Sequence, residues 1–99
     1  MIKCWKISGR VQHVGFRRLL VKNVMYIGGI SGYVYNDANG DVLVCAETDI
    51  EKMEQLLSLL YKGPMFARVD SVVAVPELEK IFPPLENGVF KVLTNKTFG

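Results

Sequence analysis

The sequence predicts an α+β fold, a ferredoxin-like sandwich with the element order βαββαβ, in which two helices cover one face of an antiparallel sheet. Two segments repeat apolar residues at helical spacing, the segments between them are rich in β-forming residues, and an Asn-Gly pair separates two of these. With 99 residues, 49% of them hydrophobic, the chain is long enough for one core, and we expect a single domain over residues 1–99.

The first two predicted elements are a strand and a helix. Residues 2–8 are apolar and aromatic with partial alternation, which is typical of a strand. The helix begins near Phe16 and ends at the glycine pair 28–29. The residues of its predicted apolar face are Phe16, Leu19, Leu20, Val24 and Ile27. Trp5 and Phe16 are predicted core residues.

A hairpin follows the first helix. Residues 30–36 and 41–47 are rich in β-formers, and Asn39-Gly40 lies between them. An Asn-Gly pair between two such runs is the strongest short-range hairpin signal.

The second half of the chain predicts a helix and two strands. Thr48 and Glu51 have the spacing of a capping box, and Gly63-Pro64 ends the helix that they begin. Residues 69–75 then predict a strand. Three prolines make residues 76–87 a long irregular connection, and residues 89–93 predict a last short strand at an edge.

Charge and composition restrict the function. The net charge is +2, from 12 basic and 10 acidic residues that are interspersed, so we expect no nucleic-acid partner. No apolar run approaches the ~20 residues that span a bilayer, and the N-terminus does not read as a secretory signal. We therefore expect a cytoplasmic protein with no membrane partner, and a monomer is the default expectation. The single histidine and two distant cysteines predict no metal site.

The two cysteines lie on strands that are neighbours in this fold. Cys4 and Cys45 are both expected on the face away from the helices, where the two sulfurs could oppose each other. In a reducing cytosol we expect free thiols rather than a disulfide.

An anion site is predicted between the first strand and the first helix. Residues 9–15 bend after a strand and lead into a helix, and backbone N–H groups in such a loop form a site for phosphate-sized anions. Arg17 lies in the first helical turn, and its guanidinium offers several fixed donors. An exposed arginine beside a glycine-rich turn is also common without any ligand, so the spacing alone leaves both interpretations open.

Three motifs resemble the acylphosphatase family. Residues 9–17, GRVQHVGFR, match the family's G-x-V-Q-G-V-x-F-R except that His13 replaces a glycine. Residues 32–36, GYVYN, resemble G-[WY]-V-x-N, and residues 63–72, GPMFARVDSV, resemble G-P-x-x-A-R-V-x-x-V. The motifs occur in the family's order.

The resemblance implies an enzyme that hydrolyses the carboxyl–phosphate bond of small acyl phosphates, without metal, cofactor or phosphoenzyme. It implies that Arg17 binds the phosphoryl group and that Asn36 orients the attacking water. The backbone amides of the loop would complete the phosphate cradle, and its residues are Gln12, His13, Val14, Gly15 and Phe16.

Two departures from the motifs affect the expected activity. A glycine in a phosphate cradle commonly indicates left-handed backbone, which histidine adopts at some cost. His13 would therefore add slight strain, block the cradle, or donate to the anion when protonated, and we expect the first. The residues before Asn36 also include one more glycine than is usual in the family, which could shift Asn36 relative to Arg17.

Other functions remain as alternatives. The first is a non-catalytic anion-binding module of the same fold, impaired by His13. A second alternative is a role like that of the acylphosphatase-type domain of the hydrogenase-maturation carbamoyltransferases. We discount it, because this chain is far too short to include the remaining domains of those proteins. An RNA-recognition motif shares the element order, but residues 42–46 (VLVCA) lack the aromatic residues on which bases stack.

Overall fold

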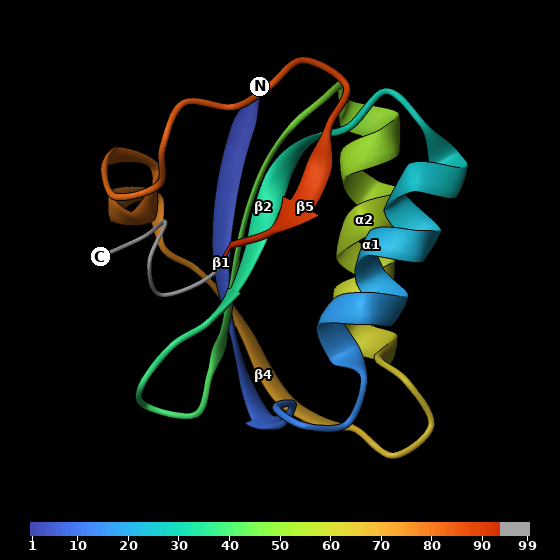
Figure 1. Ribbon diagram of the computed structural model, residues 1–99, viewed down its shortest axis with the longest axis vertical. Helices are drawn as coiled ribbons and strands as arrows, with labels where there is room; N and C mark the ends of the chain where they lie inside the picture. The colour runs from blue at the N-terminus through green and yellow to red at the C-terminus, as the bar shows by residue number, and fades with distance from the viewer. Residues whose placement is uncertain (94–99) are drawn as a thin grey trace.

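The computed structural model describes residues 1–93, and the remainder of the expected domain, residues 94–99, lies outside the described part. Its element order confirms the predicted one, with a five-residue 3-10 helix added in the long connection (Figure 1). The elements are β1 (Ile2–Arg10), α1 (Phe16–Ile27), β2 (Ser31–Asn36), β3 (Val42–Glu47), α2 (Ile50–Lys62), β4 (Arg68–Ala74), η1 (Pro76–Lys80) and β5 (Phe90–Val92).

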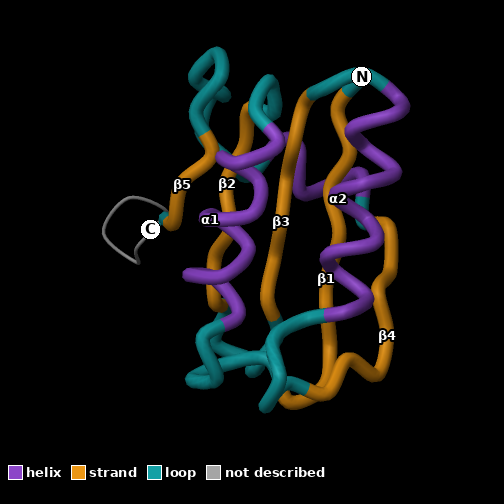
Figure 2. Tube along the Cα trace, turned by 90° about the vertical axis from the view of Figure 1, so that its right-hand side faces the viewer, coloured by secondary structure: helices purple, strands orange, loops and turns teal. Residues whose placement is uncertain are grey.

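The five strands form one sheet in the order β4-β1-β3-β2-β5, and Figure 2 shows both helices in front of it. Three of the four strand pairs are antiparallel, but β5 pairs with β2 in parallel. The expectation of a wholly antiparallel sheet is therefore wrong at this edge. The reason is the connection from residue 75 to residue 89, which crosses the other face of the sheet before β5 begins (Figure 1). As a result, β5 runs in the opposite direction to β4 and parallel to β2.

The main core lies between the sheet and the helices. Trp5 and Phe16 are both buried in it, as predicted, and Leu20 and Val24 complete the buried face of α1. Leu19 and Ile27, which the spacing also assigned to this face, are only partly buried. In the described chain, neither helix is long and apolar enough to cross a membrane.

The start of α2 differs from the predicted capping box. Its N-cap is Asp49, whose Oδ1 accepts a hydrogen bond of 2.9 Å from the backbone N–H of Lys52. Thr48 lies one residue too early, and its hydroxyl donates instead to the carbonyl of Gly29 at 2.9 Å. Either residue type can cap a helix, so the sequence alone could not place this boundary to one residue.

A second core covers the sheet face away from the helices. The connection predicted as irregular folds over this face, and Leu78 and Phe82 pack there with Tyr33 and Leu93. The rings of Tyr33 and Phe82 stack with centroids 6.2 Å apart, and the Tyr33 hydroxyl donates to the carbonyl of Pro84 at 2.7 Å. The sheet is thus buried on both faces, which composition alone did not show.

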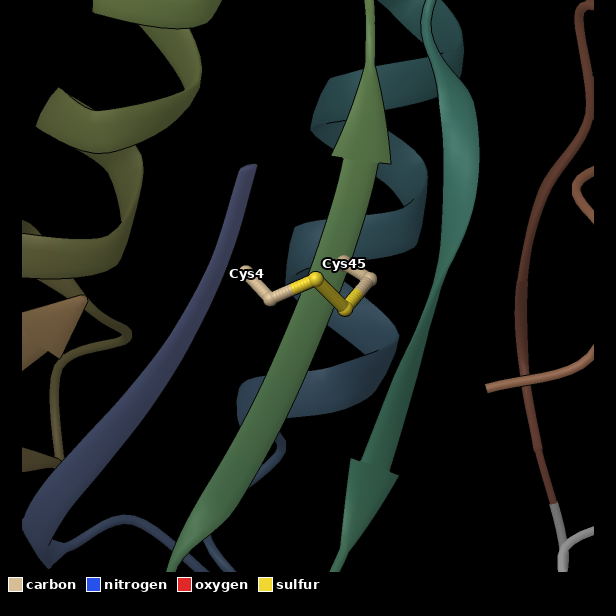
Figure 3. Close-up of a disulfide and its surroundings, with 2 residues drawn as sticks. All are labelled: Cys4 and Cys45. Atoms are coloured by element: carbon tan, nitrogen blue, oxygen red, sulfur yellow. A yellow bond between two sulfur atoms is a disulfide. The ribbon is translucent and has the colours of Figure 1, made fainter. Parts of the chain in front are cut away.

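The second core also contains a disulfide between Cys4 and Cys45 (Figure 3). The two residues face each other directly in the register of β1 and β3, and their Cα atoms are 4.1 Å apart. The predicted opposition of the two sulfurs is confirmed, whereas the expectation of free thiols is wrong. Because the two residues are directly opposed on adjacent strands, their sulfurs lie within bonding reach. The expectation of free thiols rested on a reducing cytosol and did not take this proximity into account.

Candidate active site

Gly9, the first glycine of the predicted loop, lies near the end of β1, at an irregularity in the pairing with β4. The register shifts between Ser8 and Gly9, and Gly9 has a φ of 129°. A Cβ atom at this position would overlap the carbonyl oxygen of Arg68 on β4. Gly9 is therefore needed for the close approach of β1 and β4. This is a structural reason for the glycine that involves no ligand.

His13 and Gly15 give the loop its sharp curvature. Both have left-handed backbone, with φ of 61° at His13 and 81° at Gly15. Within residues 1–93, His13 is the one non-glycine residue with a positive φ. A left-handed conformation costs a residue with a Cβ about 1–2 kcal/mol, so the loop tolerates His13 with modest strain. Its side chain is exposed, and Val11 anchors the loop in the core.

The N-terminus of α1 is open. Its N-cap, Gly15, has no side chain to cap the first N–H groups, and no acidic residue lies in the first turn. Helix α2 shows the usual pattern: Asp49 caps it, Glu51 lies in its first turn and Lys62 in its last. Since uncapped N–H groups and the helix dipole both favour an anion, the start of α1 has the character of an anion site.

Two arginines occupy this first turn, where the dipole disfavours positive charge. Arg17 is half-buried and Arg18 is exposed, and neither has an ion-pair or hydrogen-bond partner among residues 1–93. By contrast, Arg68 of the third motif binds Asp70, with Nε 2.9 Å from Oδ1. This hydrogen bond and the negative charge of Asp70 raise the pKa of Arg68. Arg17 and Arg18 therefore place two unpaired positive charges side by side in the first turn of α1.

Asn36 is the last residue of β2 and faces the same region. Its Oδ1 is buried and has no hydrogen-bond partner in the described chain. A buried amide oxygen without a partner costs about 1–3 kcal/mol, and such atoms usually bind water. The position therefore suits a bound water molecule beside the anion site.

Two hollows meet at the loop. The hairpin hollow, of about 510 Å³, is lined by Asn36 and Asp37 of the β2–β3 hairpin together with His13 and Arg17. The helix hollow, of about 600 Å³, is lined by His13, Arg17 and Arg18 and by the apolar side chains of Phe16, Val21 and Val92. His13 and Arg17 line both hollows, so the two hollows adjoin at these residues near the start of α1.

Gln12 connects the loop to the hairpin that carries Asn36. Its Nε2 donates two hydrogen bonds, of 2.8 Å to the carbonyl of Asp37 and 2.9 Å to the carbonyl of Asp41. The Asp37 carboxylate in turn accepts from the backbone N–H groups of Asn39 and Asp41 at 2.9 and 3.0 Å. Sequence reasoning placed Gln12 at the cradle but missed this role of its side chain. The acidic residue before Asn39-Gly40 is a turn signal, but no local pattern pairs it with a residue 25 positions earlier.

The structure brings Gln12, His13 and Arg17 together with Asn36 at the hairpin hollow. Of the other predicted loop residues, Gly15 and Phe16 line the helix hollow, and Val14 lines neither. A family model described as Acylphosphatase matches residues 4–82 of the chain. The chain belongs to the acylphosphatase family. The acylphosphatase of Methanocella arvoryzae is 42% identical over 74 residues, which cover 75% of this chain and 82% of that protein. The acylphosphatase of Nitratidesulfovibrio vulgaris is 39% identical over 71 residues, covering 72% and 70%. The solved structure of the Bacillus subtilis acylphosphatase matches with a TM-score of 0.75 and 25% identity, over 95% of this chain and 100% of that one.

The three acylphosphatase motifs contribute unequally to the two hollows. The first motif supplies the loop and Arg17, and the second supplies Asn36, so both line the hairpin hollow. The third motif, residues 63–72, lines neither hollow. Its glycine ends α2 and its arginine pairs with Asp70, so in this acylphosphatase the third motif supports the fold around the site.

Proposed function

We propose that this acylphosphatase hydrolyses the carboxyl–phosphate bond of small acyl phosphates in the hairpin hollow. One observation carries the proposal: Arg17, whose half-buried guanidinium is unpaired, and Asn36, whose buried Oδ1 has no partner in the described chain, line the same hollow at an open helix N-terminus. An anion and a water molecule can therefore be held side by side, as attack of water on a phosphoryl group requires.

In this proposal the phosphoryl group lies against the start of α1. Arg17 binds its non-bridging oxygens, and the backbone N–H groups of residues 12–16 complete the cradle. The backbone donors are fixed before the substrate arrives, so they stabilise the charge on those oxygens in the transition state with little reorganisation. Because a carboxylate is a good leaving group, positioning and charge stabilisation provide most of the catalysis.

Asn36 orients the attacking water through Oδ1, which accepts one of its hydrogen bonds. A new bond forms between the water oxygen and phosphorus as the bond between phosphorus and the carboxyl oxygen breaks. The electron pair of the broken bond leaves with the carboxylate, and both hydrogens of the water remain on the phosphate. No group on the protein forms a covalent intermediate in this route.

The proposal includes a monomer in the cytoplasm. A disulfide is unusual in a reducing compartment, but Cys4 and Cys45 are only 3% and 1% exposed, which restricts access of a reductant to the sulfurs. Sedimentation of the purified protein tests the monomer, cell fractionation tests the compartment, and alkylation of free thiols in a fresh lysate tests whether the disulfide persists there.

The decisive experiment follows hydrolysis of benzoyl phosphate by its ultraviolet absorbance, in the presence of a chelator. We expect turnover in the wild-type protein, a loss of about a thousandfold or more in Arg17→Ala, and a loss of about a hundredfold or more in Asn36→Ala. Lys22→Ala removes an exposed charge from α1, and Asn39→Ala changes an exposed residue of the hairpin; neither residue lines a hollow, and both variants should keep wild-type rates.

A folded wild-type protein that does not hydrolyse benzoyl phosphate would overturn the proposal. If inorganic phosphate nevertheless protected it from thermal unfolding, the anion-binding module would be the correct description, and His13→Gly would be the variant in which to look for restored turnover.

A further inference from the structure

We propose that the helix hollow receives the acyl group of the substrate, and that Arg18 selects acyl phosphates that carry a second negative charge on that group. This inference rests on the proposed function, because it assigns the part of the substrate that the proposal leaves unplaced. It adds a binding site for the organic part of the substrate and a residue that determines specificity.

The geometry of the reaction places the acyl group. In phosphoryl transfer the attacking and leaving oxygens lie roughly in line through phosphorus. Asn36, which holds the attacking water, lines the hairpin hollow and not the helix hollow. With the phosphoryl group at Arg17, which lines both hollows, the leaving carboxylate points away from Asn36, and the helix hollow is the space beside Arg17 that Asn36 does not line.

The lining of the helix hollow fits the body of an acyl group. Val21 on α1 and Val92 on β5 form apolar walls together with Phe16 and Val11. Its volume of about 600 Å³ accommodates a small organic acid. The aliphatic or aromatic part of the substrate can therefore leave water at this surface, which favours binding.

Charge then distinguishes among acyl groups. Arg18 lines the helix hollow and has no partner among residues 1–93, and no acidic residue lines this hollow there. The hairpin hollow differs, because Asp37 lines it. In the helix hollow, a carboxylate or phosphate at the far end of the acyl group would meet the guanidinium of Arg18 with no acidic side chain beside it. In the hairpin hollow the same group would lie near Asp37.

The experiment compares two substrates of nearly equal shape, 4-carboxybenzoyl phosphate and its uncharged analogue 4-carbamoylbenzoyl phosphate. The measured quantity is the ratio of their kcat/KM values, in the wild-type protein and in Arg18→Gln. Taking this ratio between variants removes the intrinsic difference in reactivity between the two substrates. We expect the ratio to fall by up to about fivefold in Arg18→Gln, the upper end of the range for an exposed ion pair.

Two further variants separate a local contact from a general effect of charge. Arg18→Lys keeps the charge and should retain part of the preference for the carboxylate. Lys22→Gln removes a neighbouring exposed charge on the same helix, outside the hollow, and should leave the ratio at its wild-type value. High salt should reduce the preference in the wild-type protein.

The outcomes distinguish this inference from the proposed function. If the wild-type protein hydrolyses both substrates and the ratio is the same in Arg18→Gln, the selectivity of Arg18 is refuted while the acylphosphatase activity stands. An equal fall in Lys22→Gln would also refute it, because the effect would then be long-range. If the folded wild-type protein hydrolyses neither substrate, the proposed function fails and the inference fails with it.

Discussion

Loss of the Cys4–Cys45 disulfide should reduce the stability of the fold far more than its activity. The bridge closes a segment with a sequence separation of 41 residues between neighbouring strands. In the chain-entropy description, a closed loop of this size restricts the unfolded state by about 4 kcal/mol at 25 °C. For a domain near 100 residues, a loss of this size lowers the melting temperature by roughly 20 °C.

The assay is urea unfolding of oxidised and reduced protein, followed by far-ultraviolet circular dichroism. Because both sulfurs are buried beneath residues 75–85, reduction should be carried out in denaturant before refolding. The double variant Cys4→Ala/Cys45→Ala is the matched control: it should have the lower stability and should not respond to a reductant. Neither cysteine lines the hairpin or helix hollow, so reduced protein that remains folded should keep its rate of hydrolysis.

Two results would refute this reasoning. Two alkylatable thiols in the unreduced, denatured protein would show that the bridge does not form. Equal free energies of unfolding with and without a reductant would show that the register of β1 and β3 is held without help from the covalent link.

Three further variants test the loop. His13→Gly should change the free energy of unfolding by less than about 1 kcal/mol, because relief of left-handed strain is offset by a more flexible unfolded chain; its affinity for phosphate should change more, and phosphate affinities equal to wild type from pH 5 to pH 8 would leave His13 no part in binding. Gly9→Ala should destabilise the fold by about 3 kcal/mol in urea unfolding, because the new methyl group would overlap the Arg68 carbonyl, and a change below about 0.5 kcal/mol would contradict the packing argument. Gln12→Met should lower kcat about tenfold while the inhibition constant of phosphate stays near wild type, because the two lost bonds hold the hairpin with Asn36 and not Arg17; an equal further loss in an Asn36→Ala background would show that Gln12 does not act through Asn36.

The sequence predicted the elements well because their signals are local. The apolar spacing of the two helices, the Asn39-Gly40 turn and the glycine-rich loop each depend on a few adjacent residues. The parallel edge strand and the cover over the second face were not predicted, because both depend on the path of residues 75–89 across the sheet. Membership of the acylphosphatase family was predictable from the motifs. The two hydrogen bonds of Gln12 were not, because they join residues far apart in the chain.

The region around the start of α1 contains several features that are individually unfavourable for stability. Helix α1 begins without a cap, two unpaired arginines lie where its dipole disfavours them, His13 has left-handed backbone, and a buried oxygen of Asn36 has no partner. A fold selected for stability alone would remove such features one by one, as the capped and charge-complemented α2 illustrates. In the proposed function, a bound anion and its attendant water would satisfy the free N–H groups, the guanidinium and the amide oxygen together. The same unsatisfied groups that cost stability in the free protein are the donors and the acceptor that the proposed reaction needs.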